Sequence, residues 1–401
     1  MADRKRFLYA AAVSTDMQYS GILRKIAGQT AGMARLGWEA SYTCVQENCL
    51  LKRTGEREER FPFPACARWS ERQKRISGTI GALLAQQPCD MVYIKGFLTN
   101  PYYLAIARAA KQANPACRVV FEVATYPYWG EYKRFFAVDL RGRNVRSFLG
   151  HAREVAAHAR TTLSFSRWVD AVVTFGERTD KLWGIPAINV DNGVEVDSIP
   201  LRSDQADRSC VNLLGVVGTS VVHGYERVIE GMKRYADENP ALPIVFRIVG
   251  NNETIGELGR LAESLGLGDR VQLLGYKTAP ELAALYCVSD VGVSPLAEYR
   301  VGLNRLSPLK SREYMAAGLP LFFAYEDELL TPDLPFVRIF PNDPSPIEMR
   351  EVVDFVLACR ADPALPEKER RFAKEHFDWE IIMKQIHDFA CAAGGDGNDN
   401  T

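Results

Sequence analysis

Short apolar runs alternate with helical patterns along the whole chain. Residues 7–13 form one apolar run, and Ile22, Ile26 and Met33 then recur at the spacing of one helical face before Gly37. Alternation of this kind is typical of βαβ units around a mostly parallel sheet. In the first half we expect strands at 7–13, 38–45, 91–94, 119–123 and 171–175, a strand that runs into an Asn-Gly turn at 188–194, and helices at 22–34 and 102–113.

The pattern lapses between Glu195 and Ser209 and then resumes. Strands are expected at 211–217, 244–249, 271–274, 291–294 and 319–324, and helices at 225–238, 255–265, 279–287, 345–361 and 367–393. A length of 401 residues suits two hydrophobic cores. We therefore predict two doubly wound Rossmann-like α/β domains, the first at residues 1–195 and the second at 211–375, joined by a linker at 196–210. A helix at 376–393 is expected to pack on the first domain, and residues 394–401 are expected to form a disordered tail.

Composition is that of an ordinary globular protein, with 47% hydrophobic and 25% charged residues. A formal net charge of −1 gives no general attraction to nucleic acid, so no nucleic-acid partner is expected. The nine cysteines include no C-x-x-C pair and are expected to be reduced. No apolar run approaches the roughly 20 residues of a membrane span, and the first run is too short for a secretory leader, so a cytoplasmic protein is expected.

The segment 307–323 combines a loop, a helix and a strand. Pro308 suits a helix start, and Gly318 and Pro320 end the helix before an apolar strand. A helix N-terminus attracts anions, Lys310 adds a positive charge there, and the carboxylate of Glu313 suits the vicinal hydroxyls of a ribose. These features indicate a nucleotide site. The alternative is an ordinary solvated first turn formed by Lys310, Arg312 and Glu313.

The order of these segments resembles the GT-B fold glycosyltransferases, in particular the retaining bacterial enzymes that build polysaccharides and glycolipids. The segments that carry the resemblance are 246–250, 271–276, 286–295, 310–320 and 372–379, after an Asn-Gly-Val turn at 192–194. The resemblance implies that the second domain binds a nucleotide sugar and the first domain binds the acceptor. It also implies a cleft between the domains and a final helix that crosses back to the first.

The resemblance also assigns individual residues. Glu313 matches the glutamate that binds the ribose hydroxyls, and Lys310 matches a lysine that faces the diphosphate. Gly218 opens the loop near the phosphates, followed by Thr219, and Gly21 follows Ser20 in a loop that is expected near the sugar. The other residues expected around the nucleotide are Asn251, Tyr276 and Lys277.

Three positions depart from the pattern. Arg305 stands where the first glutamate of a pair is expected, and Thr219 and His223 stand where a basic pair is expected. Our hypothesis is that Arg300, Arg305 and Lys310 neutralise the diphosphate instead. The alternative is that Arg300 and Arg305 only solvate a long loop.

Chemistry in the first domain is assigned to Glu122, at the end of an expected strand. Burial beside an apolar strand would raise its pKa, so Glu122 is a candidate to orient or deprotonate the acceptor hydroxyl. The alternative is a structural carboxylate paired with an arginine. Lys310 and the helix start would stabilise the departing diphosphate. No Asp-x-Asp stands at an expected strand end and His151 and His158 lack a third ligand, so no metal is expected.

Basic and aromatic residues gather in the first domain, around Trp69, at residues 133–136 and at residues 141–149. Such mixtures favour an anionic membrane surface, so a peripheral position on the inner face of the cell membrane is expected; a solvated helix face is the alternative. The expected function is transfer of a hexose from a nucleotide-diphosphate sugar to a saccharide or lipid-linked acceptor, with retention. The donor is expected to be linked to UDP rather than GDP, and no cofactor is expected. A degenerate GT-B subunit that binds sugar or a partner transferase is the alternative, and a nucleotide-sugar epimerase ranks below it.

Overall fold

The computed structural model describes residues 4–16, 19–217, 221–251 and 253–393, and these form two compact units. Unit 1 comprises the described residues up to Gly193 together with those from Trp379 onward, and unit 2 comprises Val194–Asp378. The expected tail, 394–401, lies outside the described residues. The expected linker, 196–210, lies inside unit 2, and the chain returns to unit 1 at Trp379 instead of 376.

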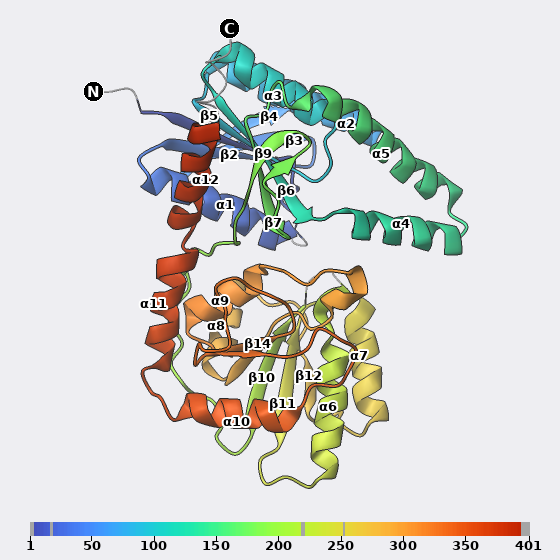
Figure 1. The fold of residues 1–401 in the computed structure, drawn as a ribbon, viewed down its shortest axis with the longest axis vertical. Coiled ribbons are helices and arrows are strands. Elements are labelled where there is room, and N and C mark those ends of the chain that lie inside the picture. Colours follow the sequence, from blue (N-terminus) through green and yellow to red (C-terminus); the bar gives the residue numbers. More distant parts are fainter. Residues whose placement is uncertain (1–3, 17–18, 218–220, 252, 394–401) are drawn as a thin grey trace. The chain divides into compact units, whose positions relative to one another are not determined.

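Unit 1 contains a nine-stranded sheet in the order β4-β3-β2-β1-β5-β6-β7-β9-β8 (Figure 1). The pairs from β2 through β1, β5, β6 and β7 to β9 are parallel, as the alternation of strands and helices predicts. Its edges are antiparallel, because β2, β3 and β4 form a meander and β8 pairs with β9 through a tight turn. The strands are β1 (Arg6–Ala10), β2 (Glu39–Gln46), β3 (Cys49–Thr54), β4 (Arg57–Pro62), β5 (Met91–Gly96), β6 (Arg118–Tyr126), β7 (Ala171–Gly176), β8 (Lys181–Leu182) and β9 (Ile185–Asn189).

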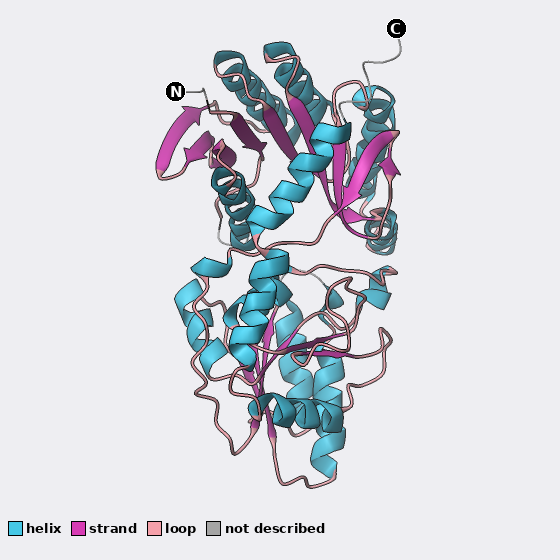
Figure 2. Ribbon diagram, turned by 60° about the vertical axis from the view of Figure 1, so that its left-hand side comes forward, coloured by secondary structure: helices cyan, strands magenta, loops and turns pink. Residues whose placement is uncertain are grey.

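Helices cover both faces of this sheet (Figure 2). They are α1 (Ser20–Arg35), α2 (Trp69–Gln86), α3 (Pro101–Ala113), α4 (Trp129–Arg141), α5 (Val145–Phe165) and α12 (Trp379–Ala393). The C-terminal helix α12 packs along α1 on one face. Trp379 is 2% exposed there, and a Cβ atom at Gly28 would lie 2.3 Å from its ring. Glycine at this position therefore makes the close approach of α12 possible.

Unit 2 contains a six-stranded parallel sheet in the order β12-β11-β10-β13-β14-β15. Its strands are β10 (Val211–Val216), β11 (Ile244–Val249), β12 (Val271–Leu273), β13 (Val291–Val293), β14 (Leu321–Phe323) and β15 (Val337–Ile339). The helices are α6 (Tyr225–Asp237), α7 (Glu253–Ser264), α8 (Ala279–Cys287), α9 (Leu309–Ala317), α10 (Met349–Arg360) and α11 (Leu365–Phe377). Two apolar cores fill this unit, one under α6, α7 and α10 and one under α8, α9 and α11.

The helix expected at 367–393 is two helices, because the backbone of Asp378 is extended (φ −62°, ψ 138°) and ends α11. At this break the backbone N–H of Val194 donates to the carbonyl of Phe377 at 2.7 Å, so the two points where the chain passes between the units are tied to each other.

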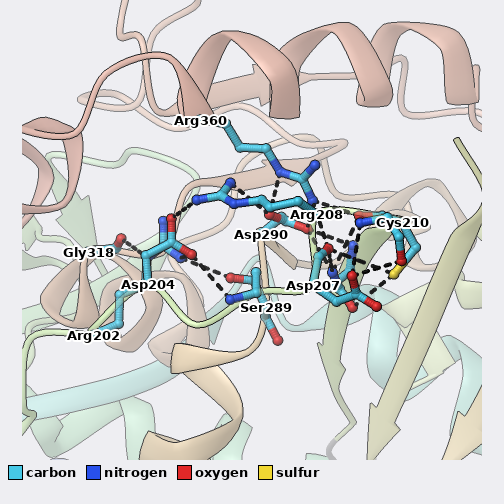
Figure 3. A network of polar contacts seen from close by, with 12 residues as sticks. Arg202, Asp204, Asp207, Arg208, Cys210, Ser289, Asp290, Gly318 and Arg360 are labelled. Carbon is cyan, nitrogen blue, oxygen red and sulfur yellow. Dashed lines mark hydrogen bonds and ion pairs between the residues drawn. The ribbon is translucent and has the colours of Figure 1, made fainter.

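A polar network holds the segment 202–210 to the amino edge of the unit 2 sheet (Figure 3). Arg360 donates to both carboxylate oxygens of Asp290 at 2.8 and 2.7 Å. Arg202 donates to the carbonyls of Gly318 and Ser289. The pair between Arg360 and Asp290 is charge-assisted and bidentate, and Arg360 also donates to the backbone carbonyl of Cys210. Such contacts order the segment strongly. This explains why a stretch that is polar in sequence is not a free linker.

Candidate functional site

The loops at the carboxyl edge of the unit 2 sheet lie together, as the sequence predicts for a doubly wound sheet. The backbone of Leu296 and Ala297, after β13, donates to the carbonyls of His223 and Val222, after β10. Gly250 N–H donates to the carbonyl of Gly275, so the loops after β11 and β12 also meet. Ligands of such sheets bind at this edge.

Helix α9 starts at this edge and runs away from it. Its N-cap residue, Pro308, has no side-chain acceptor, so it does not cap the N–H groups of the first turn. The helix ends at Gly318, whose φ of 69° is left-handed and where a Cβ atom would lie 2.7 Å from the carbonyl oxygen of Pro366. Glycine is therefore required at this stop. The helix start is left facing the loops that follow β10 and β13.

Lys310 lies in the first turn of α9 and its ammonium points to the end of β10. Its Nζ donates to the carbonyl oxygen of Val216 at 2.7 Å and lies 2.9 Å from Nδ1 of His223. Burial lowers the pKa of Lys310 to about 7, although Glu298 and Glu313 act in the opposite direction. The group is therefore close to its titration point at neutral pH, and a bound anion would favour its charged form.

Glu298 is a residue of this site that the sequence did not reveal. It lies in the 3₁₀ turn Glu298–Val301 after β13, is 1% exposed, and stabilises the charged form of Lys310. Nothing in the local sequence distinguishes it from a surface carboxylate, because its burial depends on the packing of the long loop between β13 and α9. Glu313 is partly exposed on α9, one turn beyond the helix start.

Two sets of contacts hold the start of α9 in place. Ser311 shares hydrogen bonds with Ser294, at the end of β13, and with Tyr325, after β14. The guanidinium of Arg312 is wholly buried and donates to Asp327 at 2.7 Å, and it lies 3.8 Å from the centre of the Phe377 ring. The alternative of a solvated first turn is therefore wrong for Arg312, because its partners come from distant parts of the chain.

Arg300 and Arg305 have carboxylate partners instead of converging on Lys310. Arg300 donates to Glu226 at 2.6 Å, and Arg305 forms an ion pair with Glu328. Their pairing supports the alternative that these arginines order the loop. Their expected role toward a diphosphate stays a hypothesis.

Other residues expected around the nucleotide are distributed as follows. Asn251 is exposed after β11, and Tyr276 is 45% exposed after β12. Lys277 follows Tyr276 in the chain, with its Nζ 3.7 Å from Glu281. Gly218 and Thr219 lie outside the described residues. Gly21 belongs to unit 1, in the first turn of α1, and a Cβ atom there would meet nothing within 4 Å.

Glu122 in unit 1 is the centre of a buried ion cluster. Lys95 and Lys25 lie 2.7 and 3.1 Å from its Oε1, and the hydroxyls of Tyr9 and Tyr93 donate to its Oε2 at 3.0 and 2.9 Å. Burial alone would raise the pKa of Glu122, but the two lysines hold that pKa well below its usual range. The expected rise is therefore wrong. A carboxylate with 0% exposure and these partners fits the structural alternative, with lysines in place of the expected arginine, and the catalytic role of Glu122 stays a prediction.

The two histidines of unit 1 are held by protein groups. His151 Nδ1 lies 2.7 Å from Asp139, and His158 contacts Thr99 and Tyr128. Burial lowers the pKa of His158. Among the described residues, no group of three or more His, Cys, Asp or Glu could hold a metal ion.

Comparisons with known proteins agree with this architecture. Residues 211–324 match the family model described as Glycosyl transferases group 1. A comparison with curated proteins found no match in sequence.

Solved structures match over nearly the whole chain. A glycosyltransferase from Rickettsia africae shares 11% identity at a TM-score of 0.61, with 98% of this chain and 100% of the other covered. The catalytic domain of starch synthase IV from Arabidopsis thaliana, bound to ADP and acarbose, shares 11% identity at a TM-score of 0.63, with 98% and 99% covered. Anabaena HepE in complex with UDP shares 13% identity at a TM-score of 0.57, with 97% and 100% covered.

The matched segment 211–324 contains β10 to β14 and the whole of α9, so it includes Lys310, Glu313, His223 and Glu298. The site described above therefore lies in the segment that matches the group 1 glycosyltransferase model, and the chain has the GT-B fold.

Proposed function

We propose that the chain transfers a hexose from a nucleotide-diphosphate sugar to a saccharide or lipid-linked acceptor, with retention at the anomeric carbon. The observation that carries the proposal is the position of Lys310, whose ammonium lies at the carboxyl end of β10 beside the uncapped start of α9. A helix N-terminus with an adjacent cation is suited to a diphosphate.

In this proposal the start of α9 acts on the leaving group. Negative charge develops on the diphosphate oxygen as the bond to the sugar breaks, and the sugar becomes oxocarbenium-like. Donors that are already oriented toward that oxygen lower the barrier, because they need no reorganisation during the reaction. Ser294, Ser311, Arg312 and Asp327 would act as positioning residues, since they hold the first turn of α9 rigidly in unit 2.

The remaining assignments extend the proposal. Glu313 would bind the ribose hydroxyls, and Asn251, Tyr276 and Lys277 would border the base. We propose a UDP sugar as donor, which is supported by the complexes of Anabaena HepE with UDP and with UDP-glucose. We propose that no divalent metal is needed, since the sequence has no Asp-x-Asp at a strand end and Lys310 with the helix start would balance the diphosphate charge.

The test is turnover of a donor panel by the purified protein. UDP-glucose, UDP-galactose, GDP-mannose and ADP-glucose are incubated with the protein, and release of nucleoside diphosphate is measured with and without EDTA. We expect slow hydrolysis of a UDP sugar that resists EDTA and is lost in Lys310→Ala. Lys368→Ala is the control, because Lys368 is exposed in the same unit and pairs with Asp362.

Three other outcomes contradict parts of the proposal. Binding of a nucleotide sugar without any turnover would favour the degenerate subunit. Isomerisation of the sugar without release of nucleotide would favour an epimerase. Inhibition by EDTA that is reversed by a divalent metal would reject a metal-independent reaction, and the anomeric form of the released sugar, read by NMR, tests retention.

A further inference from the structure

Exposed apolar side chains concentrate in one part of the molecule. Thirteen large apolar residues are exposed in the part of the chain that the structure describes, and seven of them lie between residues 129 and 163, in α4 and α5. These seven are Trp129, Phe135, Val138, Leu140, Val145, Leu149 and Leu163. Single exposed apolar residues are common on protein surfaces, but a concentration of this kind marks an interaction surface.

The two helices form a hairpin that joins the core of unit 1 at one end and packs on itself toward the other. Phe136 packs edge-on against Phe148 with ring centres 5.1 Å apart, and Phe135 stacks on His151 at 5.2 Å. Helix α4 packs mainly on α5, whereas α5 also contacts α3. Figure 1 shows α4 and the adjoining end of α5 extending beyond the sheet of unit 1. The connection between the helices is thus the end of the hairpin farthest from that sheet.

This end of the hairpin, residues 138–149, is called the hairpin tip below. Val138, Leu140, Val145 and Leu149 are 56, 66, 67 and 47% exposed. Arg141, Arg143 and Arg146 stand between them in sequence, and all three are exposed. The one acidic residue of the tip, Asp139, is buried and bonded to His151. Apart from Asn144, which caps α5, the exposed side chains at the tip are therefore apolar or cationic, and none of them is a carboxylate.

The charge of the hairpin differs from that of the rest of the chain. Residues 129–165 contain seven Lys and Arg and three Asp and Glu, a net charge of +4, whereas the whole chain has −1. The remainder of the chain is therefore acidic by comparison. A partner for the tip must accept apolar groups and offer anionic groups over the same few residues.

We propose that the hairpin tip docks on an anionic lipid membrane surface. The four apolar side chains would enter the interface between headgroups and acyl chains, and the three arginines would reach lipid phosphates with their long side chains. Apolar insertion or electrostatic attraction alone gives weak binding, but the two together give stable peripheral association. The proposal is independent of the reaction catalysed, because none of the tip residues belongs to the site in unit 2.

The test is co-sedimentation of the full chain with phosphatidylcholine vesicles, with and without phosphatidylglycerol, at low and high salt. We expect binding only to the anionic vesicles, and weaker binding at high salt. Replacing Arg141, Arg143 and Arg146 with serine should weaken binding about 100-fold, since each cation near such a surface contributes about 1 kcal/mol. Leu140→Ser with Val145→Ser should weaken it about tenfold.

Leu163→Ser is the matched control, because Leu163 is 84% exposed on α5 but lies outside the tip. It should bind vesicles like the unchanged protein, and thermal unfolding should show that all variants are folded. Equal binding to neutral and anionic vesicles, no binding to either, or tip variants that bind normally would overturn the proposal. A dimer that is lost in the tip variants, with no vesicle binding, would instead identify a second copy of the chain as the partner.

Discussion

The Nζ atom of Lys310 lies 2.9 Å from Nδ1 of His223, so the first turn of α9 meets the segment that follows β10. The two residues are 87 positions apart in the chain. His223 stands where the resemblance to GT-B enzymes places a cation, and the structure shows that it borders the lysine that supplies positive charge from the other side. The site thus combines a lysine that is charged below about pH 7 with the partial charge of a helix start.

Replacing Lys310 with alanine is expected to weaken nucleotide binding. A hydrogen bond to a charged group contributes about 1.5 to 3 kcal/mol, which corresponds to a rise in Kd of about 10- to 100-fold. Isothermal titration with UDP measures this directly, with Lys368→Ala as the control. An unchanged Kd for Lys310→Ala would remove this lysine from the binding site.

Binding of a UDP sugar is expected to weaken as pH rises. With a pKa of about 7 in the free protein, Lys310 is mostly charged at about pH 6 and mostly neutral at about pH 8, so its contribution should fall about tenfold over this range. A UDP sugar is used because its diphosphate does not titrate there. Lys310→Arg should bind with little pH dependence, since arginine stays charged. If this variant kept the same pH profile, the titrating group would be another residue, such as His223.

Replacing Glu122 with glutamine is expected to destabilise unit 1 by about 3 kcal/mol or more, because it leaves Lys25 and Lys95 buried without their carboxylate. Because the pKa of Glu122 is depressed, its stabilisation is present above about pH 4 and is lost on acidification. Chemical denaturation monitored by hydrogen exchange measures both effects. Glu39→Gln, which breaks only an exposed pair with Arg6, should cost under about 1 kcal/mol. A folded, equally stable but inactive Glu122→Gln would restore the catalytic assignment.

Glu369 is expected to weaken unit 2 at alkaline pH. It is 0% exposed on α11, neither carboxylate oxygen has a hydrogen-bond partner, and burial raises its pKa well above the usual range. The contribution of Glu369 to the free energy of unfolding is therefore most favourable below about pH 4, where the carboxyl is neutral in both states. It is lost as pH rises through the pKa of Glu369 in the folded state. Glu369→Gln should make the stability of unit 2 less dependent on pH. The exposed Glu375→Gln on the same helix is the control, and identical pH profiles for both variants would contradict this account.

Replacing Gly28 with alanine is expected to loosen α12. The added Cβ atom would overlap the Trp379 ring, and such overpacking costs about 1 to 3 kcal/mol. The readouts are thermal unfolding and the rate of proteolysis within α12. Gly21→Ala on the same helix meets nothing within 4 Å and should leave both unchanged. Equal behaviour of the two variants would show that Trp379 does not depend on the space at Gly28.

The parallel sheets and the gathering of the unit 2 loops at one edge were predictable from the sequence, because both follow from local patterns. Buried parallel strands are continuous apolar runs, and the loops after them must share one edge. The meander β2-β3-β4 was not predicted, since β4 (Arg57–Pro62) is an exposed edge strand dominated by charge. The sequence reveals basic and aromatic clusters at α4 and α5 but does not predict the helical hairpin, because exposed apolar residues obscure its helical periodicity.

The chemistry of single residues was less predictable, because it depends on partners that are distant in sequence. The expected pKa rise of Glu122 failed because Lys25 comes from α1 and Lys95 from β5. The sequence around Arg312 is typical of a surface helix, but its contacts with Asp327 and Phe377 lie in the interior. The place of Lys310 was predictable, because it follows from its position in the first turn of one helix, whereas its role toward a diphosphate stays a prediction.

The most direct test is a crystal structure of the protein with UDP bound. The account predicts that the diphosphate lies at the start of α9, within hydrogen-bonding distance of Nζ of Lys310 and of the first N–H groups of that helix. A nucleotide bound elsewhere, or a Lys310 ammonium that points away from the phosphates, would contradict it.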